Sequence, residues 1–199
     1  REYFGFPAAI GQWGLRFYTV ATYAFLHYNF FHILFNLLWL YWMGNLFLDF
    51  LKPRQFQTVY WGGVLSGAIL FALIFNLAPN LRAEHTILIG ASAAVMAIFG
   101  AIATLIPNYS IRLLIFGNVK LKYLLLVYVI IDVLGASSGA SNMGGNIAHL
   151  GGVLFGFTYI RLLQRGTDLS RLRVRKPKMK VVRNEQATKK SKKATQQEI

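Results

Sequence analysis

Residues 87–106 read ILIGASAAVMAIFGAIATLI, and no charged side chain interrupts this run. A membrane-spanning helix needs about 20 mostly apolar residues at a rise of about 1.5 Å each, and the run has this length. Its small residues form a face against which a second helix can pack closely. These residues are Gly90, Ala93, Ala94 and Ala97. The run therefore predicts a helix that lies among other helices in a membrane.

The composition of the whole chain favours the same environment. Its 199 residues are 55% hydrophobic and only 14% charged, whereas soluble domains carry about 25% charged residues. Half of the charged side chains lie in residues 166–199, so the first 165 residues are poor in charge. We expect a first loop over residues 1–20, a transmembrane domain over 21–165 and a basic, disordered tail over 166–199.

Four further apolar runs have the length of a spanning helix or come near it. The connections after the first and third runs, and the tail, are rich in Lys and Arg, which predicts that they share one side of the membrane. Five spans then leave the first residue on the opposite side, and we expect a sixth span before Arg1. The fold class is an all-α polytopic membrane protein. The four runs are residues 23–47, 58–77, 121–134 and 145–163.

The charge and the missing cysteines exclude several kinds of site. The net charge is +14, and the tail alone carries +8 of it. A basic tail after an apolar span predicts attraction to anionic lipid rather than to nucleic acid. A chain without cysteine has no disulfide, zinc–thiolate site or cysteine nucleophile. We expect no cofactor and no metal, because the polar residues of the first span include no carboxylate or thiol ligand.

The first span carries polar side chains that are costly in hydrocarbon. His32 and Asn36 are one helical turn apart and share a face, and His27 lies just over a turn earlier. Ionisable side chains within spans are functional by default. The alternative interpretation is that they only form hydrogen bonds between helices.

A serine and a histidine in later spans complete the pattern. Ser92 lies about five residues into its span, where the start of a helix offers free N–H groups to an oxyanion, although Gly-Ala-Ser-Ala-Ala is also typical of close helix packing. Gly152 and Gly156 follow His149 on one face, so this span can approach that of Ser92. A histidine at matching depth predicts a base for the hydroxyl. Asp132 lies about mid-span, so we expect no carboxylate on His149 and a Ser–His dyad.

In order and separation, the motifs HxxxxHxxxN (27–36), GxS (90–92) and AHxxGxxxG (148–156) resemble those of rhomboid intramembrane serine proteases. The resemblance covers about residues 10–165 and implies a rhomboid-like helical bundle of six spans, of which five are visible. It implies Ser92 as the nucleophile and His149 as the general base. It further implies His32 and Asn36 as oxyanion stabilisers, and His27, Gly90, Gly152 and Gly156 as structural residues near the site.

Two residues depart from the pattern of this family. Ala93 replaces the glycine that usually follows the serine, and its methyl group could crowd the oxyanion region. Met96 stands where well-known members carry a tyrosine that stacks on the base, and its sulfur can still pack on an imidazole.

The resemblance implies an endopeptidase that hydrolyses peptide bonds of single-pass transmembrane substrates. We expect a bacterial inner membrane, with the site opening outward and the C-terminus cytoplasmic. The main alternative is a catalytically inactive rhomboid-like protein that binds membrane clients without cutting them. A channel or transporter with a histidine-lined path is disfavoured, because the outer halves of the spans lack carboxylates and the chain has no inverted repeat.

Overall fold

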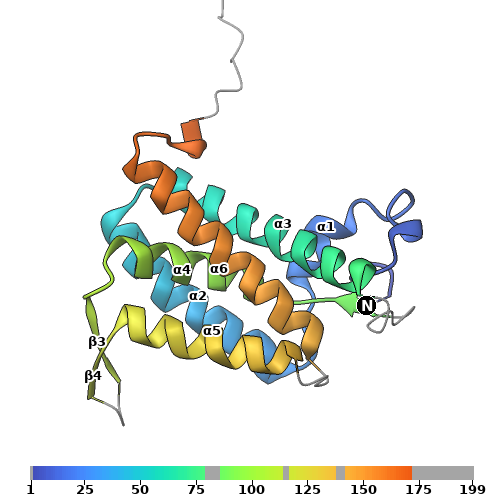
Figure 1. Cartoon of the computed structure of the whole chain (residues 1–199), viewed down its shortest axis with the longest axis horizontal. Coiled ribbons are helices and arrows are strands. Elements are labelled where there is room, and N and C mark those ends of the chain that lie inside the picture. The colour runs from blue at the N-terminus through green and yellow to red at the C-terminus, as the bar shows by residue number, and fades with distance from the viewer. Residues whose placement is uncertain (1, 79–85, 114–116, 138–141, 172–199) are drawn as a thin grey trace, which may run out of the picture.

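The computed structural model describes residues 2–78, 86–113, 117–137 and 142–171. The five longest helices of the described residues form a bundle (Figure 1). The helices α2 and α3 are long and apolar enough to cross a membrane, and α4 is a shorter apolar helix. The predicted helical membrane bundle is confirmed. The five helices are α2 (Phe30–Phe50), α3 (Pro53–Leu77), α4 (Ser92–Leu105), α5 (Leu121–Ser137) and α6 (Met143–Gln164).

Smaller elements connect these helices. A four-residue helix α1 (Thr19–Thr22) precedes α2, and short 3-10 turns occur at Ile10–Gln12, Tyr23–Phe25 and Leu169–Arg171. Strands β1 (Phe6–Pro7) and β2 (Ile87–Leu88) pair antiparallel, with Phe6 opposite Leu88. Strands β3 (Ser110–Leu113) and β4 (Gly117–Lys120) form an antiparallel pair between α4 and α5.

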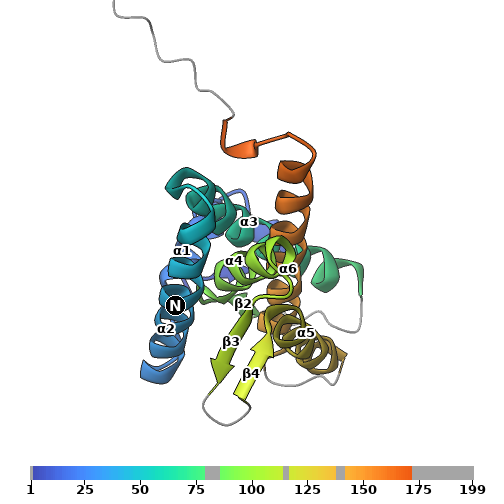
Figure 2. The ribbon, with the colours of Figure 1, turned by 90° about the vertical axis from the view of Figure 1, so that its left-hand side faces the viewer.

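Helix α4 lies at the centre of the bundle and contacts α2, α3, α5 and α6 (Figures 1 and 2). All its residues from Ala93 to Ala103 are buried. The closest approach is to α6, where a Cβ added to Gly152 would lie 2.0 Å from the Ala93 carbonyl oxygen. A Cβ added to Gly156 would lie equally near the Ala97 carbonyl oxygen. The predicted contact between the small faces of these two helices is confirmed.

Two helices begin later than the apolar runs predict. Helix α2 begins at Phe30 because the Asn29 side chain accepts a hydrogen bond from the His32 amide and caps the helix. His27 therefore precedes the helix instead of lying within it. Helix α4 begins at Ser92 because the residues before it pair with β1, so Ser92 is the first residue of its helix and not about the fifth.

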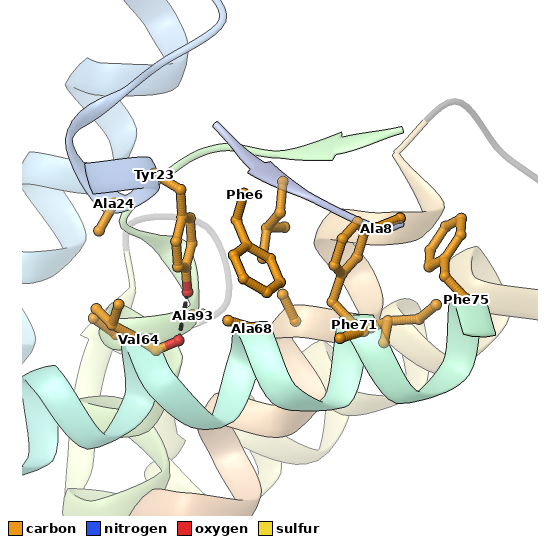
Figure 3. Packing of buried hydrophobic residues seen from close by; sticks show 14 residues of the cluster. Phe6, Ala8, Tyr23, Ala24, Val64, Ala68, Phe71, Phe75 and Ala93 are labelled. Carbon is orange, nitrogen blue, oxygen red and sulfur yellow. Dashed lines mark hydrogen bonds between the residues drawn. The ribbon is translucent and has the colours of Figure 1, made fainter. Parts of the chain in front are cut away.

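The N-terminal segment packs on α3 next to the start of α4 (Figure 3). Phe6 and Tyr23 join Phe71 of α3 in one buried cluster. The Tyr23 hydroxyl donates a 2.7 Å hydrogen bond to the Val64 carbonyl oxygen. These contacts hold the segment over one end of the bundle, which we call the site end. Helices α2, α4 and α6 all begin there.

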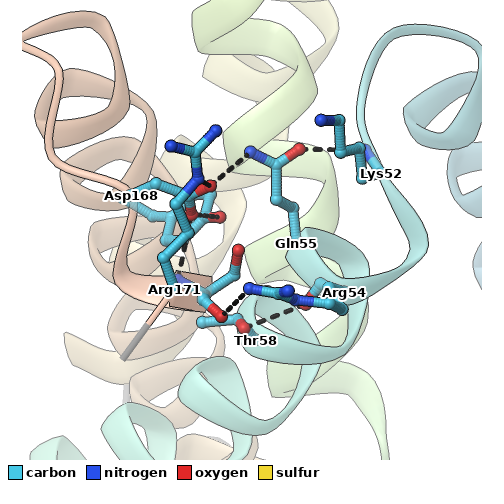
Figure 4. A network of polar contacts seen from close by, with 8 residues as sticks. Lys52, Arg54, Gln55, Thr58, Asp168 and Arg171 are labelled. Carbon is cyan, nitrogen blue, oxygen red and sulfur yellow. Dashed lines mark hydrogen bonds and ion pairs between the residues drawn. The ribbon is translucent and has the colours of Figure 1, made fainter. Parts of the chain in front are cut away.

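The opposite end of the bundle, which we call the basic end, holds the α2–α3 connection, the start of α5 and the end of α6. Gly166 to Arg171 were expected to belong to a disordered tail, but they contact α3 (Figure 4). Arg54 donates to the Ser170 carbonyl oxygen at 2.7 Å, and the Gln55 amide donates to Asp168 at 3.2 Å. This part of the tail is ordered because its polar groups find partners on α3. The remaining tail, 172–199, lies outside the described residues.

Candidate active site

The structure brings the four predicted catalytic and oxyanion residues to one cavity at the site end. The cavity has a volume of about 660 Å³ and contains Ser92, His149, His32 and Asn36 in its lining. Three helices, α2, α4 and α6, supply these side chains. The lining also includes Tyr28, Asn29 and Asn142, so the cavity is more polar than the helix faces around it.

Ser92 occupies the first position of α4, and the loop before it is held in an unusual backbone conformation. Gly90 has φ +116°, which side-chain-bearing residues rarely adopt, and its amide donates to the Tyr23 carbonyl oxygen at 2.9 Å. A Cβ at Gly90 would lie 3.0 Å from His32 Nε2 and 3.6 Å from Ser92 Oγ. A glycine here thus lets the histidine of α2 approach the serine of α4. The first amides of α4 have no acceptor within the helix and carry its positive dipole end.

His149 of α6 is paired with a carboxylate that sequence analysis did not assign to it. Its Nδ1 lies 2.9 Å from Oδ1 of Asp132, which is only 4% exposed. The expectation that no carboxylate reaches His149 is wrong, because Asp132 lies near the end of α5 and His149 near the start of α6, and these two ends meet where the helices pack together. A signal was present in the sequence: Asp132 is the only ionisable acid in its span, and such a residue needs a partner.

Ser92 and His149 also share a second cavity of about 290 Å³ between α2 and α5, which Asp132 and Met96 help to line. Within the described residues the Ser92 hydroxyl has no hydrogen-bond partner. Catalytic hydrogen bonds are often long in free enzymes and tighten when substrate binds. The two side chains thus line the same cavities from two different helices.

His32 is held in one tautomer by the backbone. The Tyr28 amide donates to His32 Nδ1 at 3.1 Å, so in the neutral ring the proton resides on Nε2. Asn36, one turn later, donates from Nδ2 to the His32 carbonyl oxygen at 2.8 Å, and its amide has a second N–H. Both residues therefore offer N–H donors to the cavity.

His27 contacts His32 without joining its hydrogen bonds. The two rings meet edge to face with centroids 5.1 Å apart. Both ring nitrogens of His27 are buried, with no partner among the described residues. Its position next to the His32 ring is consistent with a structural role near the site.

The two departures from the family pattern have clear surroundings. The Ala93 methyl group faces α3, since a Cβ added to Gly67 would lie 2.6 Å from it. The methyl group therefore packs between helices and does not crowd the oxyanion region. Met96 is buried and lines the second cavity together with His149. Among the described residues there is no group of three or more metal-ligating side chains.

Comparison with known proteins identifies the family of this domain. A model of the Rhomboid domain matches residues 14–166. The presenilin-associated rhomboid-like protein A, mitochondrial, of Danio rerio is 28% identical over 69% of this chain and 35% of its own length. The RHOMBOID-like protein 12, mitochondrial, of Arabidopsis thaliana is 29% identical over 69% of this chain and 44% of its own. The chain thus spans less than half the length of these relatives.

The names of these relatives overturn one expectation. They are mitochondrial proteins, as is the presenilin-associated rhomboid-like protein of Bos taurus, which is 27% identical over 68% of this chain. The expectation of a bacterial inner membrane, with a cytoplasmic C-terminus, is therefore wrong. It came from the shortness of the chain and its basic tail, and neither feature distinguishes one membrane from another.

Proposed function

Because this chain belongs to the rhomboid family, whose members lie in lipid and have membrane proteins as partners, we propose that it is an intramembrane serine endopeptidase. Its substrates are single-pass transmembrane proteins. One observation carries the proposal: Ser92 and His149, from two helices in close contact, line one polar cavity with the N–H donors of His32 and Asn36. A helix that only packs has no need of this set of donors.

The first half of the reaction forms an acyl-enzyme. The Ser92 oxygen attacks the substrate carbonyl carbon while His149 takes the hydroxyl proton. The negative charge moves to the carbonyl oxygen, where His32 Nε2–H, the second amide proton of Asn36 and the Ser92 backbone amide stabilise it. The C–N bond then breaks, and His149 returns the proton to the leaving amine.

The second half releases the acyl group. Water enters through the cavity at the site end, gives a proton to His149 and adds its oxygen to the acyl carbon. The same donors stabilise the second oxyanion. The ester bond to Ser92 breaks, the proton returns to the serine oxygen, and the free enzyme is restored.

A rhomboid-like protein that binds membrane clients without cutting them is the second candidate. Two observations favour it: the Ser92 hydroxyl has no hydrogen bond to a described residue, and the relatives carry the words rhomboid-like in their names. In this case the cavity would bind a client segment, and neither Ser92 nor His149 would be needed for the interaction.

Labelling with a fluorophosphonate, which reacts only with activated serines, distinguishes the two candidates. The full chain in detergent micelles should be labelled, and Ser92→Ala and His149→Ala should abolish labelling. Ser66→Ala is the matched control, because the Ser66 hydroxyl donates to the Gly151 carbonyl oxygen at 2.9 Å and serves helix packing. A folded chain that stays unlabelled, next to an active rhomboid that is labelled, would assign the client-binding function instead.

The lipid partner of the protein is proposed to be anionic. Residues 166–199 carry a net charge of +8 and follow α6 at the basic end. Basic residues next to a membrane surface each contribute about 1 kcal/mol of attraction to anionic headgroups. Flotation with vesicles that contain anionic lipid, compared with neutral vesicles at low and high salt, tests this attraction with a peptide of residues 166–199.

A further inference from the structure

Asp132 is a buried carboxylate inside a helix of a membrane bundle. Burying its charge there costs free energy unless a partner stabilises it. Four carboxylates fall within the described ranges: Glu2, Asp49, Asp132 and Asp168. Only Asp132 among them contacts a histidine, and its Oδ1 lies 2.9 Å from Nδ1 of His149. Charged residues within spans are expensive, and they pair with one another or mark functional sites.

We propose that Asp132 is a positioning residue for the reaction, the third member of a Ser92–His149–Asp132 relay; this inference rests on the proposed endopeptidase function. Asp132 Oδ1 accepts the proton on Nδ1 of His149. The neutral ring then keeps the lone pair on Nε2, which is the nitrogen that must take the serine proton. The carboxylate also stabilises the imidazolium that forms when the serine attacks.

The surroundings of the pair suit this role better than that of a link between helices. The second oxygen of Asp132, Oδ2, is buried and has no partner among the described residues, so its described hydrogen bonding is to His149 alone. A carboxylate retained only to join α5 to α6 would be expected to satisfy both oxygens. Asp132 and His149 also line the same cavity as Ser92.

Other polar groups that face the pair do not offer an equal partner for Nδ1. On α5, Tyr128 lies one turn before Asp132, and on α6, Asn146 lies one turn before His149. From α2, Asn36 lines the cavity with an uncharged amide oxygen, and His32 has its Nδ1 occupied by the Tyr28 amide. A neutral side chain in place of Asp132 would leave the ring free to exchange tautomers.

The test combines a labelling rate with a spectroscopic measurement. The second-order rate constant of fluorophosphonate labelling is measured for the full chain and for Asp132→Asn, which keeps the shape but not the charge. We expect a decrease of about 100-fold or more, because the amide permits the wrong tautomer. Asp49→Asn, the same change at an exposed position of α2 near the basic end, is the matched control and should keep the wild-type rate.

The spectroscopic arm does not depend on activity. Nitrogen-15 spectra of labelled histidines are recorded in the Ser92→Ala background, and the His149 signal is assigned by its loss in His149→Gln. A proton on Nδ1 is expected with Asp132 present and a mixture of tautomers with Asp132→Asn. A purely structural role would lower the melting temperature without lowering the labelling rate of the folded chain.

The outcomes separate this inference from the proposed function. If the wild-type chain is labelled and Asp132→Asn reacts within about threefold of it, or if the His149 tautomer does not respond to Asp132→Asn, Asp132 is not a positioning residue. If the wild-type chain is not labelled at all, the proposed function fails and this inference fails with it. If Asp132→Asn does not fold, a proton on Nε2 instead of Nδ1 in the Ser92→Ala chain alone would refute the proposal.

Discussion

Gly90 illustrates how a single residue sets the distance between two helices. We expect Gly90→Ala to destabilise the protein by about 1–3 kcal/mol, because φ +116° strains a residue with a side chain. The new methyl group would also meet the His32 ring at about 3.0 Å from Nε2 and displace it. The melting temperature and the fluorophosphonate labelling rate check this prediction, and both should be lower than in the wild type. Gly11→Ala, where an added Cβ meets nothing within 4 Å, should change neither.

Gly67 of α3 has no side chain at the point where the Ala93 methyl group of α4 packs against it. Gly67→Ala should destabilise the protein by about 1–3 kcal/mol, because its Cβ would lie 2.6 Å from the Ala93 Cβ. In the double variant with Ala93→Gly part of this loss should be recovered, with a coupling energy of about 0.5–3 kcal/mol. A double-mutant cycle of thermal stability measures the coupling. Strictly additive effects would mean that the methyl group faces the oxyanion region after all.

At the residue scale, the sequence predicts the polar side chains of the candidate site well. Polar side chains in a span are rare and therefore stand out in the sequence. Four of them line one cavity: Ser92, His149, His32 and Asn36. The pairing of Asp132 with His149 is only partly predictable: Asp132 lies near the end of α5 and His149 near the start of α6, so their depths match, but their contact depends on how α5 crosses α6. Such a crossing depends on the packing of both helices and is not encoded in the spacing along either one.

Among the elements, the contact of α4 with α6 depends most on small side chains. Gly156→Ala should lower the stability by about 1–3 kcal/mol, because its Cβ would lie 2.0 Å from the Ala97 carbonyl oxygen, a backbone atom that cannot rotate away. Gly14→Ala, in open space, should stay within about 0.5 kcal/mol of the wild type. Denaturation in a fixed detergent compares the two variants. Equal stabilities would mean that the helices are not in close contact.

The segment after α6 gives the basic end a dependence on pH. Burial raises the pKa of the Asp168 carboxyl, but hydrogen bonds from Ser170, Tyr159 and Gln55 outweigh it and hold this pKa below its ordinary value of 3.8. The folded state therefore gains stability above about pH 4 and loses it as the pH falls through the lowered pKa.

Asp168→Asn tests this dependence. At neutral pH the variant should have a lower melting temperature, by roughly 2–4 °C, because the charged hydrogen bonds are lost. The difference from the wild type should stay constant down to about pH 4 and shrink below it. A difference that grows in acid would show that the sign is wrong.

Element boundaries could be predicted less well than the elements themselves. Each of the five apolar runs contains a long helix, because an apolar segment in lipid has few alternatives. The starts of α2 and α4 lie several residues later than the runs suggest, since an asparagine cap and a strand pairing fix them. Apolar residues such as Ile87 and Leu88 fit a strand as well as a helix, so hydropathy alone gives no signal of the change.

For the whole molecule, the position of water inside the bundle can be tested directly. The chain contains no cysteine, so an introduced thiol is the only one present. Ser92→Cys should react with a water-soluble maleimide, because it lines the cavity at the site end. Ser66→Cys, whose position on α3 is engaged with α6, should react at least about tenfold more slowly, since maleimides need a hydrated thiolate. Equal rates in liposomes would place Ser92 outside the hydrated space.

The central position of α4 has a consequence for the insertion of the protein into the membrane during its synthesis. Its 14 residues extend only about 21 Å, short of the roughly 30 Å of the hydrocarbon layer, and its sides are covered by other helices. Its glycine-bearing partner α6 ends at Gln164, 59 residues after Leu105. At about 5–20 residues per second, α4 waits about 3–12 s for its last neighbour. During this interval the nascent chain carries an incomplete helix, and the insertion machinery has to shelter it until synthesis of α6 closes the bundle.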